Sequence, residues 1–357
     1  MAIELRGGVR ACAVVGDTVF ERQAGRFLPD IRSRPVCPFD IQQKARLEEA
    51  DGLDSALVTV ASAWPDPWLV AGYALSSTST LRITVAHRPG VTQPTVAARS
   101  LATLDRLSQG RTAVHVVIGS SDADVRRDGD FADKEQRYRR AFEYLEIFTR
   151  ALESCEPFDY AGEFYRLEDA GSGFLPVQQP RPPLSIGGSS EHAQRLAARF
   201  ADIYAGTFDS LENTQRLKAK LQALADGRTL KLWKHFQVIL GDTEQAAQDT
   251  ARQWRETALG LLLARPAAEL SASPQMARDH ERQLLTQTRP AQRQEWAQAV
   301  VQRAFDGVWV GTADKVAAEI LAYHQAGIDI VQLEATTESA QDIQLRRQLI
   351  ERLRGAP

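Results

Sequence analysis

The sequence predicts an α/β protein that folds as a TIM (β/α)8 barrel with insertions. Short apolar, β-branched segments recur along its 357 residues, and most are followed by a segment whose apolar side chains have helical spacing. Alternation of this kind favours a parallel sheet, and eight such repeats favour a closed barrel. An open, doubly wound sheet is the alternative, because it uses the same alternation.

The eight strands are predicted from runs of β-branched and apolar residues. They are Val9–Val15, Ser55–Val60, Leu81–Ala86, Thr112–Ile118, Leu184–Gly187, Asp202–Ala205, Leu232–Leu240 and Asp329–Glu334. The clearest helical spacing is found in Pro94–Ser108, Lys134–Ser154 and Thr312–Ala326. Thr312 follows a glycine and is a plausible N-cap for the last of these helices.

Two stretches interrupt the alternation, although we expect one domain over residues 1–357. The segment 156–183 contains a small predicted hairpin, Asp159–Leu167, followed by a loop. The segment 265–303 is long, polar and rich in Gln and Arg. An insertion of this length in a barrel is either a lid over the site or a solvated helical excursion, and its composition does not separate the two.

Composition excludes several classes of protein. The net charge of −3 gives no basic surface for nucleic acid. No apolar run approaches the ~18 residues of a membrane helix, and the N-terminus lacks the pattern of a secretory signal. Three cysteines are too few and too scattered for a disulfide framework or a metal site. We therefore expect a cytoplasmic protein that binds neither nucleic acid nor a membrane.

The turn Gly187-Gly188-Ser189-Ser190 is the strongest candidate for a ligand site. It follows the fifth predicted strand and precedes a helix. Glycines allow a ligand to approach the backbone, and the helix N-terminus offers N–H groups and a partial positive charge. Phosphate is the natural ligand. The alternative is an ordinary helix start capped by Ser189 or Ser190.

Several motifs around this turn occur in a fixed order. They are Val85–Gly90, Pro94–Arg99, Thr103–Arg111, Gln136–Tyr138 and Phe174–Leu184. This order resembles that of the bacterial luciferase-like flavin-dependent monooxygenases, and within them the alkanesulfonate monooxygenases. The resemblance runs from about Arg34 to Ile239 and resumes near Val310. It does not cover the first ~30 residues or the segment 265–303.

The resemblance implies a luciferase-like barrel that uses reduced FMN supplied by a separate NAD(P)H-dependent flavin reductase. Such an enzyme oxidises a small organic substrate with O2 through a flavin peroxide, and the family is usually oligomeric, as a dimer or tetramer. The residues that would hold the flavin are Ala86, His87, His115, Ile118, Gly119, Tyr138, Gly188, Ser189 and Ser190. The bond between Ala86 and His87 matches one that is often a non-prolyl cis peptide in the family.

The sequence departs from the alkanesulfonate monooxygenases at the positions that suit a sulfonate. Their cysteine after the second strand corresponds to Trp64, and their asparagine on the fourth strand corresponds to His115. Their Arg-x-His pattern becomes His235-Phe236-Gln237. The arginine of their mobile loop falls near Gln302, beside Arg303, and their last tyrosine falls near Thr336. We therefore expect a retained flavin site with a different substrate.

Strand periodicity selects candidates for the chemistry. On the seventh strand, apolar residues at alternate positions face the helices and turn His235 and Gln237 inward. On the last strand the same alternation turns Gln332 and Glu334 inward. His235 is a candidate general base or hydrogen-bond donor, or else a satisfied interior histidine. The catalytic candidates are His235, Gln237 and Arg303, and Trp64 and Glu334 are candidates for the substrate pocket.

Two other functions remain open at this stage. Related barrels accept a deazaflavin, so an F420-dependent oxidoreductase is one alternative. A flavin-binding protein without turnover is the other, because the catalytic side chains of the alkanesulfonate enzymes are missing.

Overall fold

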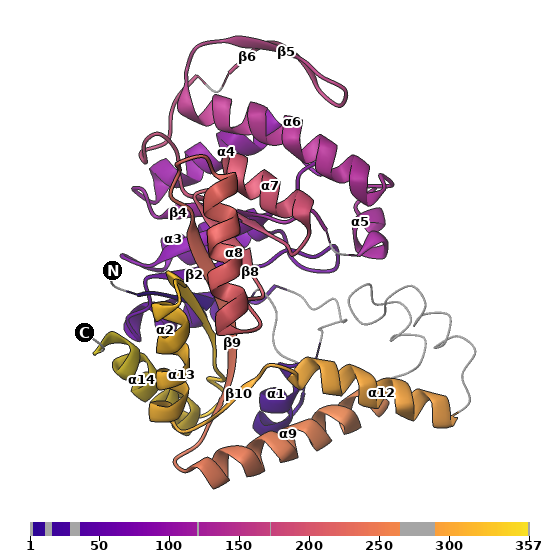
Figure 1. Cartoon of the computed structure of the whole chain (residues 1–357), viewed down its shortest axis with the longest axis vertical. Coiled ribbons are helices and arrows are strands. Elements are labelled where there is room, and N and C mark those ends of the chain that lie inside the picture. The colour runs from indigo at the N-terminus through magenta and orange to yellow at the C-terminus, as the bar shows by residue number, and fades with distance from the viewer. Residues whose placement is uncertain are drawn as a thin grey trace. The chain divides into compact units, whose positions relative to one another are not determined.

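The computed structural model describes residues 3–10, 16–28, 36–119, 121–171, 173–264 and 290–355. Its main sheet runs through β1 (Glu4–Gly8), β2 (Ser55–Val58), β3 (Arg82–His87), β4 (Thr112–Val116), β7 (Leu184–Gly187), β8 (Ile203–Gly206), β9 (Lys231–Leu240) and β11 (Ile330–Glu334). The sheet closes because β8 pairs with β9, β9 with β11 and β11 with β1 (Figure 1). This closed parallel barrel confirms the predicted TIM fold and rules out the open sheet.

The helices follow the strands along the chain. They are α1 (Val19–Gly25), α2 (Pro38–Ala50), α3 (Pro67–Ser76), α4 (Pro94–Leu107), α5 (Asp122–Arg127), α6 (Lys134–Glu153), α7 (Glu191–Phe200), α8 (Leu211–Leu224), α9 (Glu244–Leu263), α12 (Pro290–Phe305), α13 (Ala313–Gln325) and α14 (Ala340–Arg354). Local chemistry sets their starts. Asp133 and Gln136 form a capping box that begins α6, and proline opens α4. The three helices predicted by spacing are confirmed to within a residue or so.

The first predicted strand, Val9–Val15, is wrong. The strand is Glu4–Gly8, Val9 follows it as irregular chain, and residues 11–15 lie outside the described residues. The run Val9–Val15 was chosen because it is more apolar than the true strand. β1 directs two charged side chains, Glu4 and Arg6, into the barrel. They form an ion pair 3.1 Å long, and such pairing is what makes buried charge tolerable.

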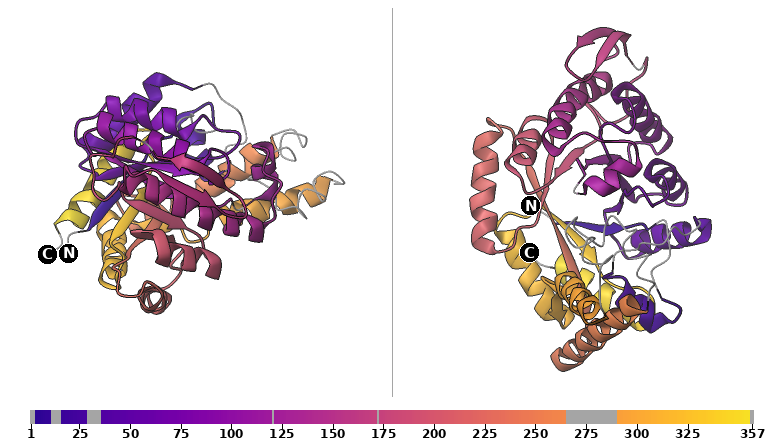
Figure 2. Two further views of the ribbon diagram at one scale, coloured as in Figure 1. Left: turned by 90° about the horizontal axis from the view of Figure 1, so that it is seen from above. Right: turned by 90° about the vertical axis from the view of Figure 1, so that its right-hand side faces the viewer.

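The predicted hairpin is confirmed. Its strands are β5 (Phe158–Ala161) and β6 (Arg166–Ala170), which pair antiparallel. The hairpin lies against α6 (Figure 2), where the Tyr160 hydroxyl donates to Glu146 Oε2 over 2.9 Å.

The segment 265–303 is only partly described, because residues 265–289 lie outside the described residues. Its last part belongs to α12, which begins at Pro290 and buries Trp296, Ala297 and Val300.

The chain packs as two compact units. The first comprises Met1–Ala11, Val36–His235 and Gln325–Gln332. Between its sheet and α2 and α3 lies an apolar core that includes Ile41, Val70 and Ile83. The second comprises Cys12–Pro35, Phe236–His324 and Leu333–Pro357. The expected single domain remains a prediction.

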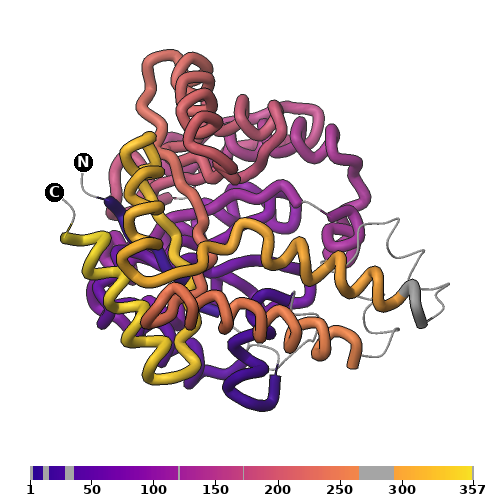
Figure 3. The backbone as a smooth tube through the Cα atoms, turned by 60° about the horizontal axis from the view of Figure 1, so that its bottom comes forward, coloured from indigo at the N-terminus to yellow at the C-terminus, as the bar shows by residue number. Residues whose placement is uncertain are grey.

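The core of the second unit lies where α1, α9 and α12 pack together. Figure 3 shows α9 and α12 side by side. Phe27 and Phe305 have ring centroids 4.4 Å apart in this core, and Trp254 packs beside Phe27. β10 (Trp309–Gly311) pairs with β9 in this unit. No helix within the described ranges is long and apolar enough to cross a membrane.

Candidate functional site

Alternation along the strands separates the inside of the barrel from its helix-facing side. Leu57, Ala86, Ile203, Trp233 and Ile330 come from five different strands and form one buried cluster, so they point inward. Their immediate neighbours along each strand therefore point outward. In parallel barrels the reactive ends are the carboxyl ends of the strands. Most of the predicted site residues stand at or near these ends, whereas Tyr138 and Arg303 lie on helices.

The turn after β7 has the geometry of a phosphate site. Ser190 is the N-cap of α7, and its Oγ accepts from the Ala193 amide over 3.2 Å. The Tyr138 hydroxyl from α6 lies 2.8 Å from the same Oγ. Gly188 has φ +139°, and a Cβ there would lie 2.8 Å from the Cβ of Ala193. The position therefore requires glycine.

Further contacts hold this turn in place. The Tyr204 hydroxyl donates to the carbonyl of Gly188, and Gln194 Nε2 donates to the carbonyl of Ser189 over 3.3 Å. Gly188 and Ser189 are exposed. The first amides of α7 point out of the helix start, where they can bind an anion. The nearby carboxylate of Glu191 is paired with Arg195, which reduces its repulsion of such an anion. The donor set fits a phosphate group.

His115 lies inside the barrel, as expected from the alternation of side chains along β4 and its pairing with the inward-facing Ala86. Its Nδ1 is 3.0 Å from Ser185 Oγ, and its ring meets Trp233 edge-on at 4.6 Å. Burial, together with the nearby Arg6 guanidinium, lowers the pKa of His115 to about 3. His115 is therefore neutral at physiological pH.

His87 lies on the other side of the sheet from Ala86. Its Nε2 is 2.6 Å from the Tyr144 hydroxyl, and its ring packs on Trp68 and Phe148. Burial lowers the pKa of His87 to about 4. The side chain thus contacts α3 and α6 and not the barrel interior, so a role for this position in flavin binding would rest on its backbone.

The expected cis peptide at Ala86–His87 is not found. Within the described residues, the cis bond is Gln179–Pro180. The Ala86–His87 bond keeps the trans form, which is the lower in energy by about 3 kcal/mol for a non-prolyl bond.

Ile118 and Gly119 continue the chain from the end of β4 toward α5. Ile118 is buried, and Gly119 has φ +94° and packs on Val125. Trp64 is half-buried in the loop between β2 and α3, where its amide donates to the carbonyl of Ala61 over 3.0 Å. Both loops follow the carboxyl ends of barrel strands, β2 and β4.

Buried ion pairs tie the same loops together. Asp124 accepts from Ser62 Oγ over 2.6 Å and pairs with Arg88 Nη2 at 2.5 Å. Arg88 also pairs with Asp128 at 2.7 Å and is only 4% exposed. One side chain on α5 therefore connects the loops after β2 and β3.

The remaining candidates lie on β9, β11 and α12. His235 is exposed at the inward-facing register of β9. In the second unit, Gln237 Nε2 donates to Glu334 Oε2 over 3.4 Å, and Arg26 donates to the backbone carbonyl of Glu334. Arg303 is exposed on α12. The structure thus brings Gln237 and Glu334 together, as their inward positions predicted.

Sequence reasoning missed the charged network inside the barrel. Arg6 Nε donates to Ser55 Oγ over 3.0 Å, and its guanidinium carbon lies 4.2 Å from the centre of the Trp233 ring. Trp233 is fixed in turn by its indole N–H, which donates to Gln332 Oε1 over 3.1 Å. The signal was present as charges at alternate positions, Glu4 and Arg6, directly before two glycines.

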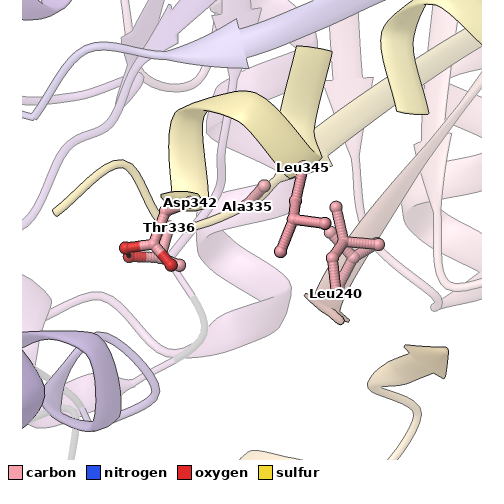
Figure 4. A pocket seen from close by; sticks show the side chains of 6 residues that line it. Leu240, Ala335, Thr336, Asp342 and Leu345 are labelled. Atoms are coloured by element: carbon pink, nitrogen blue, oxygen red, sulfur yellow. Dashed lines mark hydrogen bonds between the residues drawn. The ribbon is translucent and has the colours of Figure 1, made fainter. Parts of the chain in front are cut away.

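Two hollows lie elsewhere. One, in the second unit, holds only about 10 Å³ and has room for no organic ligand (Figure 4). It is lined by Val238, Leu240, Ala335, Thr336, Asp342 and Leu345. The other is an open apolar groove of about 450 Å³ on the outer side of α3 and α4. Neither hollow includes the turn after β7.

The chain matches the family model for luciferase-like monooxygenases over residues 35–329 and belongs to this family. Membership places it among the luciferase-like monooxygenases, which are oxidoreductases. The resemblance to the luciferase-like monooxygenases is therefore confirmed at the level of the family.

Solved structures with the same fold include enzymes of different activity. EDTA monooxygenase from Chelativorans sp. BNC1 is similar with a TM-score of 0.72 and 18% identity, over 99% of this chain and 94% of that one. The oxygenating constituent of 3,6-diketocamphane monooxygenase from Pseudomonas putida, in complex with FMN, gives 0.67 and 18%, over 100% and 99%. An F420-dependent secondary alcohol dehydrogenase gives 0.70 and 18%, over 99% and 100%. At these identities the likeness shows the fold.

Proposed function

We propose that this protein is a two-component monooxygenase that uses reduced FMN and O2 to oxidise a small organic molecule. The observation that carries the proposal is the turn Gly188–Ser190 at the start of α7, with the Tyr138 hydroxyl 2.8 Å from Ser190 Oγ. This turn stands at the carboxyl end of a barrel strand, in a chain of the luciferase-like family. Bound reduced flavin would supply the activation of oxygen.

The protein's own residues would bind and orient the cofactor. Ser189, Ser190 and the first amides of α7 would hold the phosphate, and Tyr138 would fix Ser190. Ala86, Ile118 and Gly119 would line the strand ends beside the ring. Trp64 and Glu334 are proposed for the substrate, and His235, Gln237 and Arg303 are the catalytic candidates.

The substrate is proposed not to be an alkanesulfonate. The positions that would hold a sulfonate carry Trp64, His235, Gln237 and Thr336. Thr336 lines a hollow of about 10 Å³, which is too small for a substrate. We propose a separate NAD(P)H-dependent reductase as partner, a homo-oligomeric assembly and a cytoplasmic location.

F420 is the alternative cofactor, because a dehydrogenase of the same fold carries it. It too has a phosphate for the same turn. The two cofactors differ in chemistry, since FMN supports oxygen activation and F420 supports hydride transfer.

One experiment separates these functions. Reduced FMN, mixed with the protein and air in a stopped-flow spectrometer, should pass through a transient absorbance that outlasts the oxidation of unbound FMN. FMN that reoxidises at the same rate with and without protein would contradict the oxygenase. Tighter binding of F420 than of FMN, with hydride transfer to a carbonyl compound, would replace it by the F420 reductase. Tight FMN binding with no effect on its oxidation would indicate a flavin-binding protein without turnover.

A further inference from the structure

A chain of two hydrogen bonds holds His115 in one tautomer. Ser185 Oγ donates its single proton to the carbonyl of Val114 over 3.1 Å. The same oxygen lies 3.0 Å from His115 Nδ1, so it must accept there. The proton of the neutral imidazole is therefore on Nδ1, and Nε2 carries a lone pair.

The lone pair of Nε2 is directed to the end of β7. Gly187 is the next inward position after Ser185, and it has no side chain to cover the ring. A Cβ at Gly187 would lie 3.1 Å from His115 Nε2 and 3.0 Å from its Cε1. Nε2 therefore faces the strand end that leads directly into Gly188. Across the sheet, His115 is paired with Ala86, which ends the inward face of β3.

The surroundings of His115 favour its neutral form. The charged group that acts on it is Arg6, which stacks on Trp233 and pairs with Glu4. Burial and the positive charge of Arg6 hold the pKa of His115 at about 3. A base this weak takes up few protons at neutral pH, so its lone pair suits binding better than proton transfer.

We propose that His115 binds the cofactor as a neutral hydrogen-bond acceptor, with Nε2 accepting from the ring imide N–H and Ser185 acting as the positioning residue. This rests on the proposed function. The imide is common to FMN and F420, so the proposal holds for either cofactor. With its tautomer fixed, His115 Nε2 would favour a cofactor ring that presents a hydrogen-bond donor to it. It would disfavour a ring that presents an acceptor there.

The tautomer can be measured in the protein without any cofactor. Two-dimensional NMR of protein labelled with ¹⁵N-histidine should show His115 with Nδ1 protonated and Nε2 unprotonated, without titration between pH 8 and pH 5 (about two units above the pKa of about 3). In Ser185→Ala the two tautomers should mix. Protonated Nε2 in the wild-type protein would overturn the proposal, whatever the function is.

Binding tests the ligand. His115→Leu should weaken FMN binding about five- to tenfold, as expected for one hydrogen bond. His115→Gln, which keeps an acceptor oxygen, should recover part of the loss, and Ser185→Ala should lose less than His115→Leu. Tyr144→Leu is the control, because it removes a buried, hydrogen-bonded side chain on the helix side of the sheet.

The outcomes are distinct. Equal FMN affinity of His115→Leu and the wild type, or an equal loss in folded Tyr144→Leu, would overturn the imide contact. If the wild-type protein binds neither FMN nor F420, the proposed function fails and the ligand assignment fails with it. The NMR measurement would still decide the tautomer.

Discussion

The Tyr138 hydroxyl lies 2.8 Å from Ser190 Oγ, so α6 supports the first turn of α7. If this turn holds the flavin phosphate, Ser189→Ala with Ser190→Ala should weaken FMN binding by about 1–3 kcal/mol, or roughly five- to 150-fold. Isothermal titration with FMN measures the change. The double variant should also lose about 1 kcal/mol of stability, because the N-cap is removed.

The N-cap of α8 provides the control for that variant. Ser210 Oγ accepts from the Asn213 amide over 3.1 Å, which is the same capping bond at a different helix. Ser210→Ala should cost similar stability and leave FMN affinity unchanged. Equal affinity of the wild type and the Ser189, Ser190 double variant would refute the phosphate site.

Glycine at position 188 is required by both backbone and space. Gly188→Ala would put a Cβ at φ +139° and 2.8 Å from Ala193 Cβ. We expect a loss of about 1–3 kcal/mol in the free energy of unfolding and weaker FMN binding. Urea denaturation checks the first effect. Gly72→Ala, in the helix α3 with its nearest contact at 3.5 Å, should instead gain up to about 1 kcal/mol.

The sequence predicted the barrel well because the helix-facing positions of most strands are apolar. Ser55–Val58 and Thr112–Val116 are buried along their whole length, so they form apolar or β-branched runs. β1 does not form such a run, because Glu4 and Arg6 are inside the barrel. Their burial depends on partners from other strands, such as Ser55, and no local pattern reveals such partners.

The candidate site was predictable in part. The turn Gly188–Ser190 has a local signature, and the structure gives it the expected position at a helix start. Which face a side chain takes at a strand end was harder to predict. His87 was grouped with Ala86 by the resemblance, although adjacent strand residues point to opposite sides. The role of Ser185 in fixing His115 joins β4 to β7 and needs the paired strands.

Arg88 should be a large contributor to stability. Its guanidinium is 4% exposed and pairs with Asp124 and Asp128. Arg88→Met would leave two carboxylates without their cation and should cost about 3–5 kcal/mol. Arg166→Met is the control, because Arg166 and Glu168 are 80% and 76% exposed and such pairs contribute at most ~1 kcal/mol. Urea denaturation compares the two, and equal losses would contradict the importance of the buried pairs.

Acid should destabilise the protein through His87. Burial lowers its pKa from 6.5 to about 4, so between these values the unfolded chain binds a proton that the folded chain does not. Stability from this group is present above pH 6.5 and is lost as the pH falls to about 4, with a total of roughly 3 kcal/mol. His87→Gln should reduce the slope of stability against pH in urea denaturation across that range, and the slope that remains is expected from His115, whose pKa is lowered to about 3. Phe148→Leu, which loses packing on His87 but keeps the imidazole, should lower stability without reducing the slope. A wild-type slope retained in His87→Gln would show that other groups carry the acid sensitivity.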